Sequence, residues 1–265
     1  MFKIVFSDAD GTLLTNERHI SPLTLKSVFA LKEAHIPFVI VSARSPAGIY
    51  PLFTRYGFRC PVIAFSGAVI VDEDKNVLFH EGMPKSVACQ VADFIEQNNL
   101  DCAWNAYSFE NWITRDRSDP RVAREESHVW HCAQNGSVSD FASDEVHKLL
   151  CICNPQKTTE IESRLKARFP ELSIVKSSPY LIEVMQKGIT KALAVKRYCD
   201  FVGVDVRQTI AFGDNYNDAE MLAEVGTGYL MGNAPEPLKQ VFPNHTTDNE
   251  HDGIYLVLKR FLPLD

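Results

Sequence analysis

The chain has 265 residues, of which 45% are hydrophobic and 23% are charged, and its formal net charge is −7. This length exceeds the roughly 100 to 200 residues of a usual domain, so it allows two modest domains or one large α/β domain. The composition excludes a disordered or fibrous chain, and the acidic balance without a long basic run argues against nucleic acid or an anionic membrane as a partner.

The N-terminus predicts a chain without an export signal, because it reaches Asp8 too soon to hold a secretory hydrophobic region. The apolar runs fall short of the roughly 18 residues that a membrane helix needs. Seven cysteines without an export signal favour reduced thiols over disulfides. We therefore expect a cytoplasmic protein that does not bind a membrane; its oligomeric state is open.

The first third of the chain predicts alternating strands and helices. Apolar runs at 3–6, 37–41 and 62–65 have strand length. Ser21 followed by Pro22 is a helix start, and Ser45 with Pro46 is another. Three such strands with helices between them indicate a doubly wound parallel sheet, and residues 69–79 indicate a small hairpin after it.

The pattern changes near residue 83, where a helix over 86–97 is followed by irregular, aromatic-rich sequence from about 100 to 140. Strand and helix character returns at 146–153 and 158–169. We interpret residues 83–186 as an inserted αβ domain, joined by short hinges to its neighbour.

The α/β pattern resumes from Lys187. A helix follows Thr190, an apolar strand spans 209–212, a helix spans 219–225, and a strand lies around 228–231. The predicted fold is therefore an α/β, doubly wound, Rossmann-like core made of residues 1–82 and 187–265, with the inserted domain between the two parts.

Polar residues occur where three apolar strands end. Asp8 and Asp10 follow the first, Ser42 and Arg44 follow the second, and Asp214 follows the strand at 209–212. In a doubly wound sheet ligands bind beyond the carboxyl ends of the strands, so these groups can converge although they are far apart in sequence. A single aspartate after a strand is more often a turn residue or a helix cap, but three such sites together favour a functional cleft.

The carboxylates of Asp8, Asp10, Asp214 and Asp218 would raise one another's pKa in one cleft unless a cation neutralises them. Oxygen ligands without histidine or cysteine favour magnesium. Lys191 lies in the first turn of its helix, where the helix dipole disfavours a cation, and a bound anion would resolve that conflict. The alternative for Lys191 alone is a solvated surface residue.

Four segments together resemble the motifs of the haloacid dehalogenase superfamily of aspartyl-phosphate phosphatases, and they occur in the superfamily's order. They are Asp8-Ala9-Asp10-Gly11-Thr12, Ser42-Ala43-Arg44, Lys187-Gly188-Ile189-Thr190-Lys191 and Gly213-Asp214-Asn215-Tyr216-Asn217-Asp218. The insertion between the second and third motifs is similar to the large αβ cap of the Cof-type sugar-phosphatase subfamily. The resemblance spans nearly the whole chain and is weakest in the insertion.

The resemblance implies a role for each matched residue. Asp8 would be the nucleophile and Asp10 the general acid and base, while Ser42 and Lys191 hold the phosphate. Mg²⁺ would be bound by Asp8, Asp214 and the Asp10 carbonyl, with Asp218 orienting these ligands. Thr12, Arg44 and Asn217 complete the predicted phosphate site, in which Asn217 reaches the phosphate or Lys191 and Thr12 fixes the turn that aims Asp10.

The resemblance therefore implies a magnesium-dependent phosphatase for small phosphorylated metabolites, sugar phosphates among them. A phosphotransferase or mutase would use the same motifs, and a sensor without catalysis is a third alternative. The aromatic residues Trp104, Tyr107, Trp112 and Trp130 either line a substrate pocket in the insertion or fill its core, and core filling is the favoured interpretation.

Overall fold

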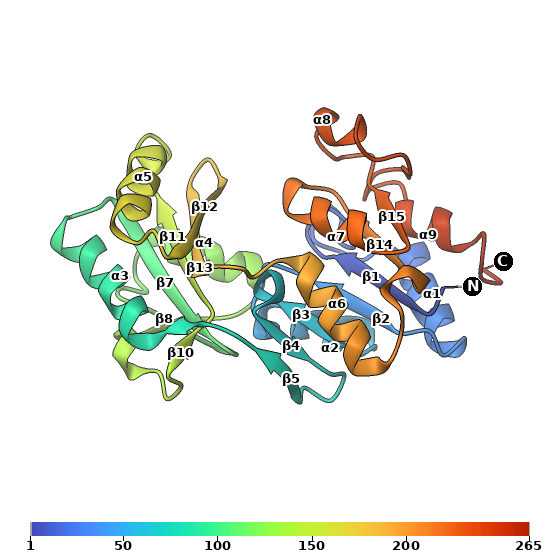
Figure 1. Ribbon diagram of the computed structural model, residues 1–265, viewed down its shortest axis with the longest axis horizontal. Helices are drawn as coiled ribbons and strands as arrows, with labels where there is room; N and C mark the ends of the chain where they lie inside the picture. The colour runs from blue at the N-terminus through green and yellow to red at the C-terminus, as the bar shows by residue number, and fades with distance from the viewer. Residues whose placement is uncertain (1, 265) are drawn as a thin grey trace. The chain divides into compact units, whose positions relative to one another are not determined.

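The computed structural model describes residues 2–264, and these fold into two compact units (Figure 1). The first unit takes the residues up to Ala43, 52–79, and those from Thr190 on. The second takes residues 44–51 and 80–189. Within the described residues no helix is long and apolar enough to cross a membrane.

The first unit is built on a seven-stranded sheet with the order β15-β14-β1-β2-β3-β4-β5. The strands from β15 to β3 are parallel, and β4 is antiparallel to β3. The strand bounds are β1 Ile4–Asp8, β2 Phe38–Val41, β3 Val62–Ala64, β4 Val69–Val71, β5 Val77–His80, β14 Thr209–Gly213 and β15 Thr227–Leu230.

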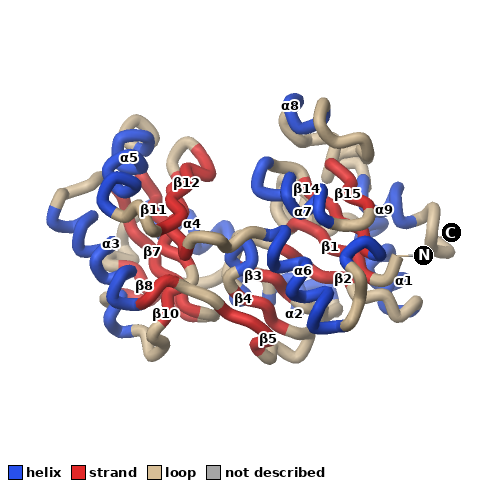
Figure 2. Tube along the Cα trace, viewed as in Figure 1, coloured by secondary structure: helices blue, strands red, loops and turns tan. Residues whose placement is uncertain are grey.

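Helices cover both faces of this sheet, as the doubly wound prediction requires (Figure 2). α6 (Lys191–Val202) and α7 (Ala219–Glu224) share an apolar core with β1, β2 and β14. On the other face α1 (Pro22–Glu33) packs against α9 (Gly253–Leu258) and β2. Two short helices, α2 (Tyr50–Tyr56) and α8 (Glu236–Lys239), complete the set.

The helix starts that the sequence predicts are present. The Ser21 side chain accepts a hydrogen bond from the Thr24 N–H, with Pro22 at the first helical position, and Thr190 caps α6 by accepting from the Leu193 N–H. Residues 46–48 form a single 3₁₀ turn, with Ser45 as its cap.

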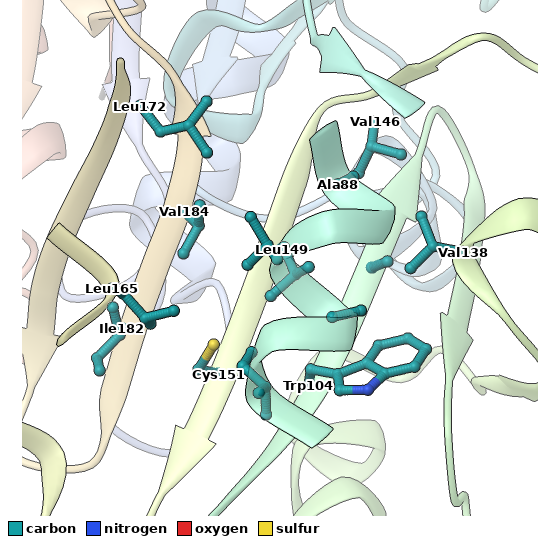
Figure 3. Packing of buried hydrophobic residues seen from close by; sticks show 14 of the residues in the cluster. Ala88, Trp104, Val138, Val146, Leu149, Cys151, Leu165, Leu172, Ile182 and Val184 are labelled. Atoms are coloured by element: carbon teal, nitrogen blue, oxygen red, sulfur yellow. The ribbon is translucent and has the colours of Figure 1, made fainter. Parts of the chain in front are cut away.

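The second unit has a six-stranded sheet with the order β12-β13-β11-β7-β8-β9. Its strands are β7 Cys102–Ser108, β8 Asn111–Thr114, β9 Gln134–Asn135, β11 Lys148–Cys153, β12 Leu172–Ser178 and β13 Leu181–Gln186, and a separate pair joins β6 Met83–Pro84 to β10 Glu145–Val146. Its helices are α3 Lys85–Gln97, α4 Pro120–Val129 and α5 Thr158–Arg168. One apolar core joins α3, α5 and one face of the sheet, with Trp104, Leu149 and Val184 inside it (Figure 3).

The stretch from about 100 to 140 is more regular than its sequence indicates, because it holds β7, β8 and α4. The alternation of polar and apolar residues is hidden, since both faces of these strands are buried. Asn105 and Thr114 are inside the protein, where Asn105 accepts from the Trp112 indole and Thr114 donates to the Trp104 carbonyl. Of the four aromatic residues in question, Trp104, Tyr107 and Trp112 are buried, while Trp130 is 37% exposed.

Candidate active site

Asp8 is the last residue of β1, and a tight turn follows it at the carboxyl edge of the sheet. The carbonyl of Asp8 accepts from the Leu13 N–H, and that of Ala9 accepts from the Leu14 N–H. Gly11 has φ +86°, and a Cβ there would lie 2.5 Å from Asp214 Oδ2. The turn therefore needs glycine both for its backbone angle and for the close approach of Asp214.

Lys191 is the first residue of α6, and only 2% of its surface is exposed. Its Nζ donates to Asp8 Oδ1 at 2.5 Å and to Asp218 Oδ1 at 2.6 Å. Two carboxylates therefore supply the negative charge that the sequence predicts beside this lysine. The surface-residue alternative is wrong, because the side chain is enclosed.

Asp218 is held by the turn that follows β14. Its Oδ2 accepts from the backbone N–H groups of Asp214 and Asn215, each at 3.0 Å. The second oxygen is thereby left for Lys191. Asp218 thus both shapes the loop that carries Asp214 and fixes the lysine.

Asp214 is held by groups from two other loops. Thr12 donates its hydroxyl to Asp214 Oδ1 at 2.8 Å. The Asn233 amide donates to the Gly11 carbonyl at 2.8 Å and to Asp214 Oδ2 at 3.3 Å. Asn233 is not among the residues that the sequence predicts for the site, although the segment Gly232-Asn233-Ala234-Pro235 beyond β15 is one that resembles the Cof-type subfamily.

Burial and charge repulsion act on the two central carboxyl groups. Burial raises the pKa of Asp8 well above its usual value, and Asp218 and Asp214 add to this while Lys191 opposes it. Burial also raises the pKa of Asp214 to about 6 against the hydrogen bond from Thr12, and the charge on Asp218 contributes. Burial disfavours the charged form of Lys191, but Asp218 and Asp8 outweigh it and raise its pKa. The group therefore has more negative charge than one lysine neutralises.

Carboxylate oxygens of Asp8, Asp214 and Asp218 lie within 4.8 Å of one another. An all-oxygen set that repels itself in a buried place fits a hard divalent cation such as Mg²⁺. The Asp10 carboxylate is not in this set, and Asp10 is exposed. Its predicted contribution to the metal is its backbone carbonyl.

The other predicted residues differ in their surroundings. Ser42 is buried directly after β2, where its N–H donates to the Ile63 carbonyl and its carbonyl accepts from the Ser66 N–H. Asn217 is exposed, and among the described residues it makes no hydrogen bond to Lys191. Its remaining predicted role is contact with phosphate. Arg44 belongs to the second unit, where it donates to the Gly48 carbonyl and lies over the Trp130 ring.

A second group of metal-ligating residue types lies in the second unit. His80 Nδ1 is 2.9 Å from Glu145 Oε2, and His147 Nε2 is 4.0 Å from the same oxygen. His147 Nδ1 accepts from the Phe109 N–H, so a neutral ring carries its proton on Nε2, the atom that would have to bind the ion. Burial lowers the pKa of His147 to about 4, which keeps the ring neutral. This group therefore fits a hydrogen-bonded cluster better than a metal site.

The Rossmann-like sheet is interrupted by an inserted unit, and a buried lysine lies among three aspartates at its carboxyl edge. These features together define an enzyme with an aspartate-based active site. The chain belongs to the haloacid dehalogenase-like hydrolases, whose family pattern matches residues 5–258. The resemblance to this superfamily is thereby confirmed.

Relatives that match nearly the whole chain support this family assignment. A Haemophilus influenzae protein with the name "Putative phosphatase" is 37% identical over 99% of each chain. The 5-amino-6-(5-phospho-D-ribitylamino)uracil phosphatase YitU of Bacillus subtilis is 26% identical over 98% of each. The crystal structure of a haloacid dehalogenase-like hydrolase from Bacteroides thetaiotaomicron superposes with a TM-score of 0.91, at 27% identity, over 99% of this chain and 100% of that one.

Proposed function

We propose that this hydrolase is a magnesium-dependent phosphatase that removes phosphate from small metabolites through a phosphoryl group held on Asp8. The carboxylates of Asp8, Asp214 and Asp218 form what we call the aspartate group. The observation that carries the proposal is the hydrogen bond of Lys191 to Asp8 within this group. An aspartate at the end of a strand, buried beside a lysine that stabilises its charged form, is placed as a nucleophile must be. The names of the relatives, which include several phosphatases, support the same chemistry.

In the first step an oxygen of Asp8 forms a bond to phosphorus while the bond from phosphorus to the ester oxygen breaks. The departing oxygen takes its proton from Asp10, two residues along the turn. Asp8 must be ionised for this attack, although burial favours its protonated form. The charge on Lys191 opposes that effect, and Mg²⁺ when bound supplies further positive charge to the same oxygens.

In the second step the Asp10 carboxylate accepts a proton from a water molecule whose oxygen attacks the phosphorus. The bond from phosphorus to Asp8 breaks, inorganic phosphate leaves, and the Asp8 carboxylate is regenerated. Asp10 is then protonated again, so protons and bonds balance over the cycle. Ser42 and Lys191 would donate hydrogen bonds to the phosphoryl oxygens and stabilise their charge.

The proposed substrates are phosphate esters of small metabolites, sugar phosphates included. Relatives at 26% identity are named for different substrates, YitU for a phosphoribityl compound and a Yersinia pseudotuberculosis protein as an HMP-PP phosphatase. The two names share only the word phosphatase. They therefore support the removal of phosphate and do not indicate which molecule carries it.

The nucleophile is tested with Asp8→Asn. We expect kcat for an aryl phosphate to fall at least about 10³-fold, because the amide cannot attack phosphorus. Asp200→Asn, a change at an exposed position of α6, is the matched control and should keep full activity. Turnover in water enriched in ¹⁸O should give phosphate with one ¹⁸O atom. Substantial activity in Asp8→Asn, or phosphate without the label, would contradict the proposed mechanism.

A further inference from the structure

A buried asparagine near the C-terminus takes no part in the mechanism described above. Asn249 lies in the loop between α8 and α9, and only 6% of its surface is exposed. Its side-chain amide donates to the Leu14 carbonyl at 2.9 Å and to Asn16 Oδ1 at 3.2 Å. A buried amide is costly unless its donors are paired, and here the partners come from the segment that follows β1. The C-terminal loop is therefore bonded to the loop that leaves the first strand.

Leu14 closes the turn that carries Asp10. Its N–H donates to the Ala9 carbonyl at 2.9 Å, and Leu14 pairs with Asp10 in a single β-bridge. Leu14 is completely buried, so its carbonyl needs a donor inside the protein. Asn249 supplies that donor and thereby fixes one end of the turn.

A second amide holds the middle of the same turn. Asn233 donates to the Gly11 carbonyl at 2.8 Å, and its own oxygen accepts from the backbone N–H of Asn249 at 3.3 Å. The two contacts set the direction of the Asn233 amide, because the reverse orientation would place its oxygen against the Gly11 carbonyl and its nitrogen against an N–H donor. Asn249 therefore acts on the turn twice, directly at Leu14 and through Asn233 at Gly11.

Asp10 lies between these two anchored residues of the turn, and it is exposed. An exposed side chain has few packing contacts to fix it, so its position depends on the backbone that carries it. A general acid must lie within hydrogen-bond reach of the oxygen that it protonates. A displacement of about 1 Å can lower the rate by as much as about 10²-fold. The anchors of the turn thus matter for the placement of this carboxyl group.

We propose that Asn249 is a positioning residue, which holds the turn 9–14 so that Asp10 reaches the departing oxygen. This role rests on the proposed function, in which Asp10 gives its proton to that oxygen in the first step. Loss of the Asn249 amide should impair proton donation more than it impairs the attack by Asp8. The loss of activity should then grow with the basicity of the leaving group, because a weakly basic leaving group departs without a proton.

The test compares phenyl phosphate with 4-nitrophenyl phosphate, two esters of similar shape, because phenolate is the more basic leaving group. We expect Asn249→Ala to lower kcat/KM for phenyl phosphate at least about 10-fold more than for 4-nitrophenyl phosphate. Asn249→Asp, which keeps the size of the side chain and removes its donors, should do the same. In an Asp10→Asn background, Asn249→Ala should change the ratio of the two kcat/KM values by less than about 2-fold, because no acid remains to be positioned.

Two further variants separate positioning from stability. Asn233→Ala, at an exposed position where the fold is not at risk, removes the second anchor and should shift the ratio in the same direction. Ser21→Ala is the matched control, because Ser21 bonds to Asp252 of the same C-terminal loop and caps α1. It should lower the melting temperature and affect both esters equally.

The proposal is overturned if the Asn249 and Asn233 variants lower kcat/KM equally for the two esters, as a purely structural role requires. It is also overturned if Asn249→Ala shifts the ratio as strongly in the Asp10→Asn background as in the wild type. A wild type that hydrolyses neither ester would contradict the proposed function and this role together. Equal losses in variants of an active wild type would refute only the role of Asn249.

Discussion

Gly11 has a positive φ, and the Asp214 carboxylate occupies the space that a side chain would need. Gly57, which follows α2, also has a positive φ (+71°), but a Cβ there would meet nothing within 4 Å. An alanine at Gly57 would be strained only by the positive φ, whereas an alanine at Gly11 would also collide with Asp214. Comparing the two substitutions therefore isolates the effect of that collision.

Gly11→Ala should lower kcat/KM at least 10-fold, because the added methyl group must displace the Asp214 carboxylate from its hydrogen bonds with Thr12 and Asn233. Gly57→Ala should destabilise the fold by about 1 kcal/mol and leave kcat/KM of the folded protein unchanged. The measurements are steady-state kinetics and urea denaturation for both variants. Equal activity in the two would show that the contact with Asp214 does not matter.

At the scale of elements, the aromatic side chains of β7 and β8 hold the second unit together. Trp112 is 1% exposed, donates its indole N–H to Asn105 Oδ1 at 2.9 Å, and stacks on Tyr107 with ring centroids 5.1 Å apart. This enclosure favours core filling over a role in lining a substrate pocket.

Trp112→Phe should therefore lower the free energy of unfolding by about 2 to 4 kcal/mol, because it removes buried area and leaves the Asn105 oxygen without its donor. The activity of the variant toward three chemically different phosphate esters should fall to the same degree. Trp130→Phe is the control and should cost less than about 1 kcal/mol, because Trp130 is partly exposed. A changed ranking of the esters at unchanged stability would instead restore the pocket-lining interpretation.

At the scale of the whole molecule, the buried carboxylates of the aspartate group should lower the free energy of unfolding when no metal is bound. In the folded protein without metal the pKa of Asp214 is raised to about 6, above its value of 3.8 in the unfolded chain. Between these values the folded state binds more protons than the unfolded state. Asp214 therefore destabilises the fold increasingly as the pH rises from 3.8 to about 6, and by a constant amount above that. Discounted for its partial exposure, the cost above pH 6 is about 2 kcal/mol.

Asp214→Asn should therefore be about 2 kcal/mol more stable than the wild type at pH 8 in excess chelator, and the difference should shrink as the pH falls to 5. Magnesium at 100 times its Kd should stabilise the wild type by about 2.7 kcal/mol and the variant much less. Urea denaturation at both pH values, with and without Mg²⁺, measures both effects. A wild type that is the more stable protein in chelator at pH 8, or that gains nothing from Mg²⁺, would contradict the metal site.

The sequence by itself determined the features that depend on local signals. Strand β1 with Asp8 at its end, the capped start of α1 at Ser21, and the start of α6 at Thr190 all follow from apolar runs and capping residues within a few positions. The convergence of Asp8 and Asp214 also followed, because parallel strands end at one edge of a sheet, and the family resemblance implied the place of Lys191 beside them.

Only the tertiary structure decided what depends on distant partners. Asn233 reaches Asp214 from a loop after another strand. In β7 and β8, polar residues are buried and hydrogen-bonded, so the usual alternation of polar and apolar residues is absent from their sequence. A cavity at the starts of β2 and β3 brings Lys32 of helix α1 together with Arg59 and Glu73 from two separate loops. No local pattern encodes such meetings, because they arise from the order of the strands in the sheet, which is set by packing of the whole unit.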